Sequence, residues 1–131
     1  TLNCKGRLLT IDQPIVMGII NTTPDSFYED SRKSSVDTAL LQAEKMIREG
    51  ATILDIGAQS TRPGSTAVGP EEEIHRLSVV VPEIHRRFPN TLLSVDTYYS
   101  TVAIAAAEMG ASIINDISGG QFDTAMIATA A

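Results

Sequence analysis

Polar side chains stand at the ends of three expected β-strands, where they could bind or transform a ligand. Asn21 ends the first strand, Asp96 the third, and Asn115 with Asp116 the fourth. A carboxylate beside side-chain amides supplies the acceptors and donors that a flat, nitrogen-rich heterocycle requires. Each residue taken alone is explained equally well as a cap of the helix that follows it. Their recurrence at strand ends favours a binding site.

Two polar stretches that follow strands could supply further groups. Residues 60–64 read Ser-Thr-Arg-Pro-Gly, which places two hydroxyl groups beside the guanidinium of Arg62. Such an arginine can clamp a phosphate or carboxylate through two hydrogen bonds, although most arginines simply face solvent. Residues 21–27 read Asn-Thr-Thr-Pro-Asp-Ser-Phe. The Phe27 ring either covers a ligand or pins this loop to the core.

These residues are positioned by an alternation of strands and helices. Apolar runs rich in β-branched residues predict strands at 15–21, 52–58, 91–97 and 112–118. Helical spacing of apolar residues predicts helices over 36–50 with Ser35 as N-cap, from Pro70 to about Phe88, over 100–109, and from about Phe122 onward. Asp55 lies inside the second strand, where burial would require a partner for its carboxylate.

This order predicts a parallel sheet with right-handed crossovers, preceded by a β-hairpin over residues 2–12. Four βα units form either a small open sheet or half of an eight-stranded barrel, and no composition shift marks a second domain. The connections 22–34 and 59–69 exceed the usual length of about 2 to 6 residues. Both follow strands, so both are expected on the carboxyl-end face of the sheet, where such folds place their chemistry.

Composition excludes several classes of partner. The 131 residues carry 10 Lys and Arg against 16 Asp and Glu, a net charge of −6, which disfavours nucleic acid and anionic membranes. No apolar run is long enough to cross a bilayer, and residues 1–13 lack the apolar core of a signal peptide. The lone Cys4 excludes an internal disulfide framework and a cysteine-rich zinc site. We therefore expect a cytoplasmic protein.

Four segments in order along the chain resemble the dihydropteroate synthase family. They are Met-Gly-Ile-Ile-Asn-Thr-Thr-Pro-Asp-Ser-Phe at 17–27, Asp-Ile-Gly-Ala-Gln-Ser-Thr-Arg-Pro-Gly at 55–64, Ser-Val-Asp-Thr at 94–97 and Ile-Asn-Asp-Ile-Ser-Gly-Gly at 114–120. The resemblance implies an α/β fold, the (β/α)8 TIM barrel. This chain would supply about the first four βα units after an N-terminal β-hairpin, so that residues 1–131 form the N-terminal half of a single pterin-binding barrel domain.

The resemblance also implies an activity. The family joins 6-hydroxymethyl-7,8-dihydropterin diphosphate to p-aminobenzoate, with Mg²⁺ as cofactor, and releases diphosphate and 7,8-dihydropteroate for folate biosynthesis. By position, Asp96 and Asn115 would hold the pterin ring, while Asn21 would help to bind Mg²⁺ and diphosphate. The whole protein would be a homodimer.

The two loops would complete the site that the resemblance implies. Phe27, Thr61 and Pro63, with Ser60 beside them, would border the p-aminobenzoate pocket, and Arg62 lies in the loop that closes over it. Asp25 and Glu29 are further catalytic candidates, because carboxylates near the reacting methylene can stabilise developing positive charge. The family commonly has a Ser-Asp-Gly-Gly type stretch where this chain has Tyr-Glu-Asp-Ser at 28–31.

Two alternative functions stay open on the sequence. A pterin-binding methyltetrahydrofolate methyltransferase domain would share Asp96 and Asn115 but would lack the Thr-Arg-Pro-Gly loop at 61–64. A non-catalytic half-barrel is the second alternative. The family's later elements, a pterin-binding Asp, a Ser-x-x-Lys segment and an Arg-x-His near the end, are not among these residues. We therefore expect the 131 residues alone to be inactive.

Overall fold

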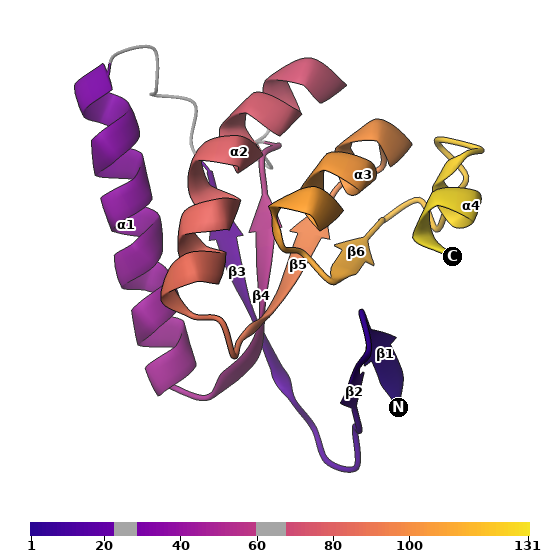
Figure 1. Cartoon of the computed structure of the whole chain (residues 1–131), viewed down its shortest axis with the longest axis horizontal. Helices are drawn as coiled ribbons and strands as arrows, with labels where there is room; N and C mark the ends of the chain where they lie inside the picture. Colours follow the sequence, from indigo (N-terminus) through magenta and orange to yellow (C-terminus); the bar gives the residue numbers. More distant parts are fainter. Residues whose placement is uncertain (23–28, 60–67) are drawn as a thin grey trace.

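The computed structural model describes residues 1–22, 29–59 and 68–131, with only the backbone for 29–34 (Figure 1). A two-stranded hairpin precedes a four-stranded sheet whose helices lie side by side along one face. The elements in chain order are β1 (Leu2–Cys4), β2 (Arg7–Leu9), β3 (Val16–Asn21), α1 (Glu29–Arg48), β4 (Ala51–Gly57), α2 (Pro70–Arg87), β5 (Leu92–Asp96), α3 (Ser100–Met109), β6 (Ile113–Asn115) and α4 (Met126–Ala130).

The sheet is parallel throughout and its order is β3-β4-β5-β6, as the alternation predicted. Because side chains alternate along a strand, one set faces the helices and the other faces away. The helix-facing set includes Ile20, Leu54 and Val95, each at most 1% exposed. These side chains share a core with apolar residues of the helices, such as Leu77 of α2 and Val102 of α3.

The hairpin covers the opposite face of the sheet near the beginning of the strands. Its turn places Lys5 at φ 52° and Gly6 at φ 83°, the backbone conformation of a tight two-residue hairpin connection. Cys4 is 3% exposed and clusters with Ile53, near the start of β4, and with Leu92, the first residue of β5. The side chain of Lys5 also donates to the Ala107 carbonyl at the end of α3. The sequence expectation of an N-terminal hairpin is confirmed.

Two helices begin and end where the sequence predicted. Helix α2 starts at Pro70, and α3 ends before Gly110 in the left-handed conformation at φ 114°. A Cβ atom at Gly110 would lie 2.6 Å from the His85 ring, so glycine is required here by both its backbone angle and its neighbour.

Three boundaries differ from the sequence expectation. Helix α1 begins at Glu29, so Ser35 lies inside it and is not its N-cap. The reason is that residues 29–35 contain no apolar side chain, and apolar periodicity therefore cannot reveal those two turns. Strand β6 ends at Asn115, because the following residues turn, and α4 begins at Met126 instead of near Phe122.

The two outer strands leave apolar side chains exposed. On β3, Val16 is 59% and Ile19 62% exposed, and Ile117 beyond β6 is 89% exposed.

In residues 1–22, 29–59 and 68–131, no helix combines the length and apolarity needed to cross a bilayer.

Candidate functional site

The parallel register brings the predicted strand-end residues into a single row across the sheet. Asn21 pairs with Gly57, Gly57 with Asp96, and Asp96 with Asn115. Residues paired in this way present their side chains on the same face of a sheet, here the face away from the helices. The three predicted polar side chains are thus brought together at the carboxyl edge. We call Asn21, Asp96 and Asn115 the polar row.

Gly57 leaves a gap within the polar row. A Cβ atom at this position would lie 3.4 Å from Asn21 Oδ1 and 3.8 Å from Asp96 Oδ2. Any side chain here would therefore fill the space between the amide and the carboxylate. The absence of a side chain keeps that space open for a ligand atom.

A second polar layer lies beneath the row. Asp55 is 4% exposed, and its Oδ2 accepts a hydrogen bond of 3.0 Å from Asn115 Nδ2. This is the partner that burial of Asp55 required, and it orients the Asn115 amide. Ser94 pairs with Asp55 across the sheet and is also buried. Within the described part of the chain, Asp55 Oδ1 and Ser94 Oγ have no hydrogen-bond partner.

Partial burial raises the pKa of Asp96, and the nearby charges of Asp55 and Asp116 add to that effect. Asp116 itself has a local role: its two oxygens accept hydrogen bonds from the backbone of Ser118 and Gly120, both at 2.8 Å. These hydrogen bonds within the turn after β6 explain Asp116, which does not join the row.

The ends of both long connections are fixed close to the row. The Thr22 backbone N–H and hydroxyl both donate to the Gly57 carbonyl, at 2.8 and 3.1 Å. At the second connection, the Gln59 side chain bonds to both backbone groups of Val68, and Arg76 Nη1 donates to the Ala58 carbonyl at 2.9 Å.

Most of the loop residues predicted for the site lie outside the described residues. These are Asp25, Phe27, Ser60, Thr61, Arg62 and Pro63. Glu29 was expected in the first loop, but it is the first residue of helix α1. The backbone places Glu29 at the end of α1 that follows the carboxyl edge of β3.

Sequence reasoning missed Glu73. This side chain is 0% exposed and lies in the first turn of α2. Burial raises its pKa, the nearby Asp96 charge adds to that effect, and contacts from Thr97, Gln59 and Arg76 oppose it. The signal was present in the sequence, because Glu73 lies four residues before Leu77 on the buried stripe of the helix.

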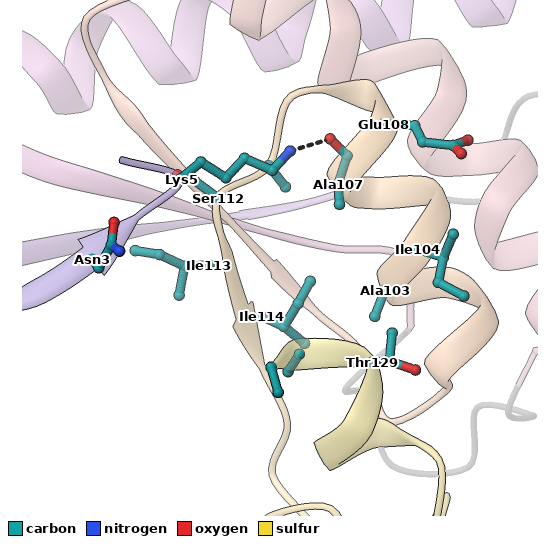
Figure 2. A pocket seen from close by; sticks show the side chains of 13 residues that line it. Asn3, Lys5, Ala103, Ile104, Ala107, Glu108, Ser112, Ile113, Ile114 and Thr129 are labelled. Atoms are coloured by element: carbon teal, nitrogen blue, oxygen red, sulfur yellow. Dashed lines mark hydrogen bonds between the residues drawn. The ribbon is translucent and has the colours of Figure 1, made fainter. Parts of the chain in front are cut away.

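A pocket lined by Ile113 and Ile114 is separate from the polar row. It has a volume of about 770 Å³ and lies along the free edge of β6, between the hairpin, α3 and α4 (Figure 2). Apolar side chains such as Ile104 and Ile114 dominate its lining, and Lys5 is engaged with the Ala107 carbonyl. The charged side chains of Lys5 and Glu108 also line the pocket.

The described residues contain no group of three His, Cys, Asp or Glu side chains that could hold a metal ion.

Comparison with known proteins identifies the family to which this arrangement belongs. Residues 17–131 match the family described as pterin binding enzyme. The chain belongs to this family. The dihydropteroate synthase of Bacillus subtilis is 47% identical over 120 residues, covering 92% of this chain and 42% of that protein. The resemblance to this family that the sequence suggested is therefore confirmed.

Solved structures of relatives agree in fold. Xanthomonas albilineans dihydropteroate synthase with 4-aminobenzoic acid matches with a TM-score of 0.83 at 41% identity, over 98% of this chain and 47% of that one. The Anaplasma phagocytophilum enzyme with bound 6-hydroxymethylpterin-monophosphate matches with a TM-score of 0.78 at 37% identity, over 86% of this chain and 43% of that one.

The comparisons also fix the fold class. This chain spans less than half the length of these relatives. Since dihydropteroate synthases are (β/α)8 TIM barrels, the expected fold class is confirmed, and the four βα units correspond to about the first half of the barrel.

Proposed function

We propose that the whole protein is a dihydropteroate synthase. It would condense 6-hydroxymethyl-7,8-dihydropterin diphosphate with p-aminobenzoate, giving 7,8-dihydropteroate and diphosphate. The observation that carries this proposal is the polar row at the carboxyl edge, in a chain of the pterin-binding enzyme family. Residues 1–131 would form the N-terminal half of its single barrel domain.

Asp96 and Asn115 would bind the pterin ring. The Asp96 carboxylate can accept two N–H donors, as a ring amide and its neighbouring amino group present them. Asn115 donates to Asp55, which fixes the plane of its amide and leaves Oδ1 as an acceptor for the ligand. Asp55 thus supports the ring site from below. A charged acceptor beside an oriented amide suits a heterocycle with alternating donors and acceptors.

Asn21 would bind Mg²⁺ and the diphosphate group. An amide oxygen is the hard type of ligand that Mg²⁺ accepts, and this ion takes few protein ligands when phosphate oxygens and water complete its shell. The open space at Gly57 beside Asn21 Oδ1 is compatible with that arrangement. When bound, Mg²⁺ would offset the negative charge of the leaving diphosphate.

The loops would provide the site for the second substrate. By resemblance, the p-aminobenzoate pocket would be bordered by Ser60, Thr61, Pro63 and Phe27. Arg62 would close over the bound substrates, while Asp25 and Glu29 would stabilise positive charge on the pterin. In the reaction, the bond from the methylene carbon to the diphosphate oxygen breaks, a bond to the arylamine nitrogen forms, and the nitrogen releases a proton.

The methyltransferase alternative is less well supported. The Thr-Arg-Pro-Gly sequence at 61–64 and the 47% identity to a dihydropteroate synthase both favour the synthase. We also propose that the whole protein acts in the cytoplasm as a homodimer. The net charge of −6 and the single cysteine of these 131 residues are in keeping with the cytoplasmic location.

An assay of the whole protein tests this function. The pterin diphosphate, p-aminobenzoate and Mg²⁺ are supplied together, and dihydropteroate and diphosphate are measured by chromatography. We expect both products in equal amounts and neither when any one component is omitted. Methyl transfer from methyltetrahydrofolate without dihydropteroate formation would instead favour the alternative.

A further inference from the structure

Asp55 is the charged residue that strands β3 to β6 carry in their interior. Asp96 ends β5, whereas Asp55 is followed by Ile56 and Gly57 within β4. In register, Asp55 lies between Ile19 on β3 and Ser94 on β5. An apolar side chain at this position would match Ile19 beside it. The carboxylate therefore needs a reason beyond packing.

Burial makes this carboxylate costly. Asp55 is 4% exposed, and within residues 1–22, 29–59 and 68–131 its Oδ1 has no hydrogen-bond partner. The Oγ atom of the neighbouring Ser94 likewise lacks a partner among those residues. Taking a carboxylate oxygen out of water without a hydrogen bond costs stability. A residue kept at such a cost inside a sheet is a candidate for a functional role.

The other oxygen of Asp55 makes a hydrogen bond that crosses a whole strand. Oδ2 accepts from Asn115 Nδ2 at 3.0 Å, although Asp55 lies on β4 and Asn115 on β6, with β5 between them. Neighbouring strands are spaced about 4.8 Å apart, so β4 and β6 of a flat sheet would be separated by about 10 Å. Both side chains must therefore lean over β5, on the sheet face away from the helices.

Asn115 depends on this hydrogen bond for its place. The residue is exposed, and β6 is an outer strand of the sheet. Among the described residues, Asp55 is the hydrogen-bond partner of its side chain. Without that partner, an exposed amide could rotate about its side-chain bonds toward solvent. The bond to Asp55 instead draws the amide across β5, the strand that ends at Asp96.

The carboxylate also settles which end of the Asn115 amide faces which way. An ionised carboxylate only accepts hydrogen bonds, so the group turned toward it must be the Nδ2 amino group. Asp55→Asn could donate as well as accept, and it would leave both orientations of the Asn115 amide possible. The acid at position 55 therefore selects one orientation.

We propose, resting on the function proposed above, that Asp55 is a positioning residue of the pterin site. By holding the Asn115 amide over β5, it brings Asn115 to the side of Asp96, so that both groups act on the same ring. Asp55 does this from beneath the polar row and does not itself touch the ligand.

The first test is Asp55→Ala in the whole protein, which removes the hydrogen bond without adding bulk. Binding of 6-hydroxymethylpterin monophosphate is measured by calorimetry, with Asp37→Ala at an exposed position of α1 as the matched control. We expect the pterin Kd to rise about tenfold, the equivalent of one oriented hydrogen bond, and to stay unchanged in the control. Asp55→Asn, which can still accept from Asn115, should lose less affinity than Asp55→Ala.

A double variant separates positioning from simple structural support. If Asp55 acts through Asn115, adding Asp55→Ala to Asn115→Ala should weaken pterin binding by less than twofold further. A structural role would give the same additional loss in both backgrounds, and that result would overturn the proposal. An unchanged pterin Kd in Asp55→Ala alone would overturn it as well.

The Tm of each variant is measured alongside, because Asp55 is buried. If Asp55→Ala does not fold, Asp55→Leu fills the space with an apolar side chain of similar size, and the same results are expected of it. Failure of both variants to fold would make Asp55 a structural residue and overturn the proposal. If wild type binds the pterin and the folded Asp55 variant binds it equally well, this inference fails alone. If wild type does not bind it, the proposed function fails instead.

Discussion

Asp96 and Asn115 lie in register on neighbouring strands, so loss of either should weaken pterin binding by the whole protein. Asp96→Ala or Asn115→Ala leaves ligand donors or acceptors without partners, at a cost of about 1–3 kcal/mol for each group. We expect Kd for 6-hydroxymethylpterin monophosphate to rise roughly 5- to 150-fold in calorimetry. Asp12→Ala is the control, because Asp12 is exposed and lies ahead of β3, whose opposite end carries the row. Unchanged affinity in both site variants would contradict the assignment.

The raised pKa of Asp96 gives pterin binding a pH dependence. Ring N–H groups donate to the charged carboxylate, and the proton is retained up to a higher pH than by an ordinary Asp, whose pKa is about 3.9. We therefore expect affinity to fall as pH is lowered, beginning at a higher pH than an ordinary Asp would give. Calorimetry at several pH values with wild type and Asp96→Asn is the measurement. If the pterin affinity of Asp96→Asn still falls on acidification as it does in wild type, another group is responsible for the pH dependence.

Neighbouring strand ends could be predicted from residue types alone, because parallel register aligns Asp96 with Asn115 wherever both end their strands. The space at Gly57 and the hydrogen-bond partner of Asp55 could not be predicted from residue types. Both depend on which residues face each other across strands that are far apart in sequence. Glu73 was missed for another reason: its place four residues before Leu77 indicates burial, but the helix dipole already accounts for acidic residues at a helix start.

At the scale of elements, the start of α3 is capped by a residue from a later segment. Asp123 Oδ2 accepts from the Ser100 N–H at 2.8 Å, and its other oxygen accepts from the Ala125 N–H at 3.0 Å. The Phe122 ring beside it lies 4.4 Å from the ring of Tyr98, centre to centre. These contacts join the segment after β6 to the beginning of α3.

Replacing Asp123 should consequently destabilise the whole protein. Hydrogen bonds from Ser100 and Ala125 lower the pKa of Asp123. Its contribution is thus present above the ordinary Asp pKa and lost as pH falls through the lowered value. We expect Asp123→Ala to have a lower Tm at neutral pH, and Asp123→Asn to fall between it and wild type. A Tm of Asp123→Ala equal to wild type at neutral pH would show that the cap contributes nothing.

The helix ends show which boundaries can be predicted from the sequence and which cannot. The start of α2 at Pro70 and the end of α3 before Gly110 follow from local backbone chemistry, and both were predicted. The start of α1 was not, because its first turns contain only polar residues, and the cap of α3 comes from 23 residues further along the chain. A cap that is distant in sequence leaves no local signal.

At the scale of the molecule, the outer strands β3 and β6 predict that the isolated 131-residue chain self-associates. Val16 and Ile19 on β3 are more than half exposed beside unpaired backbone groups, and such edges pair with other chains. Size-exclusion chromatography with light scattering should show oligomers or aggregates. Val16→Lys should reduce them, since a charge on an edge strand opposes pairing. A stable wild-type monomer would mean that these edges are protected in some other way.

The central claim is that the polar row binds a pterin, and a crystal structure of the whole protein with 6-hydroxymethylpterin monophosphate tests it most directly. We expect the pterin ring to lie on the sheet face away from the helices, with ring nitrogens about 3 Å from Asp96 and Asn115. Asn21 should lie on the phosphate side of the ligand. A pterin bound elsewhere, such as in the pocket beside β6, with the polar row contacting only solvent, would contradict the account.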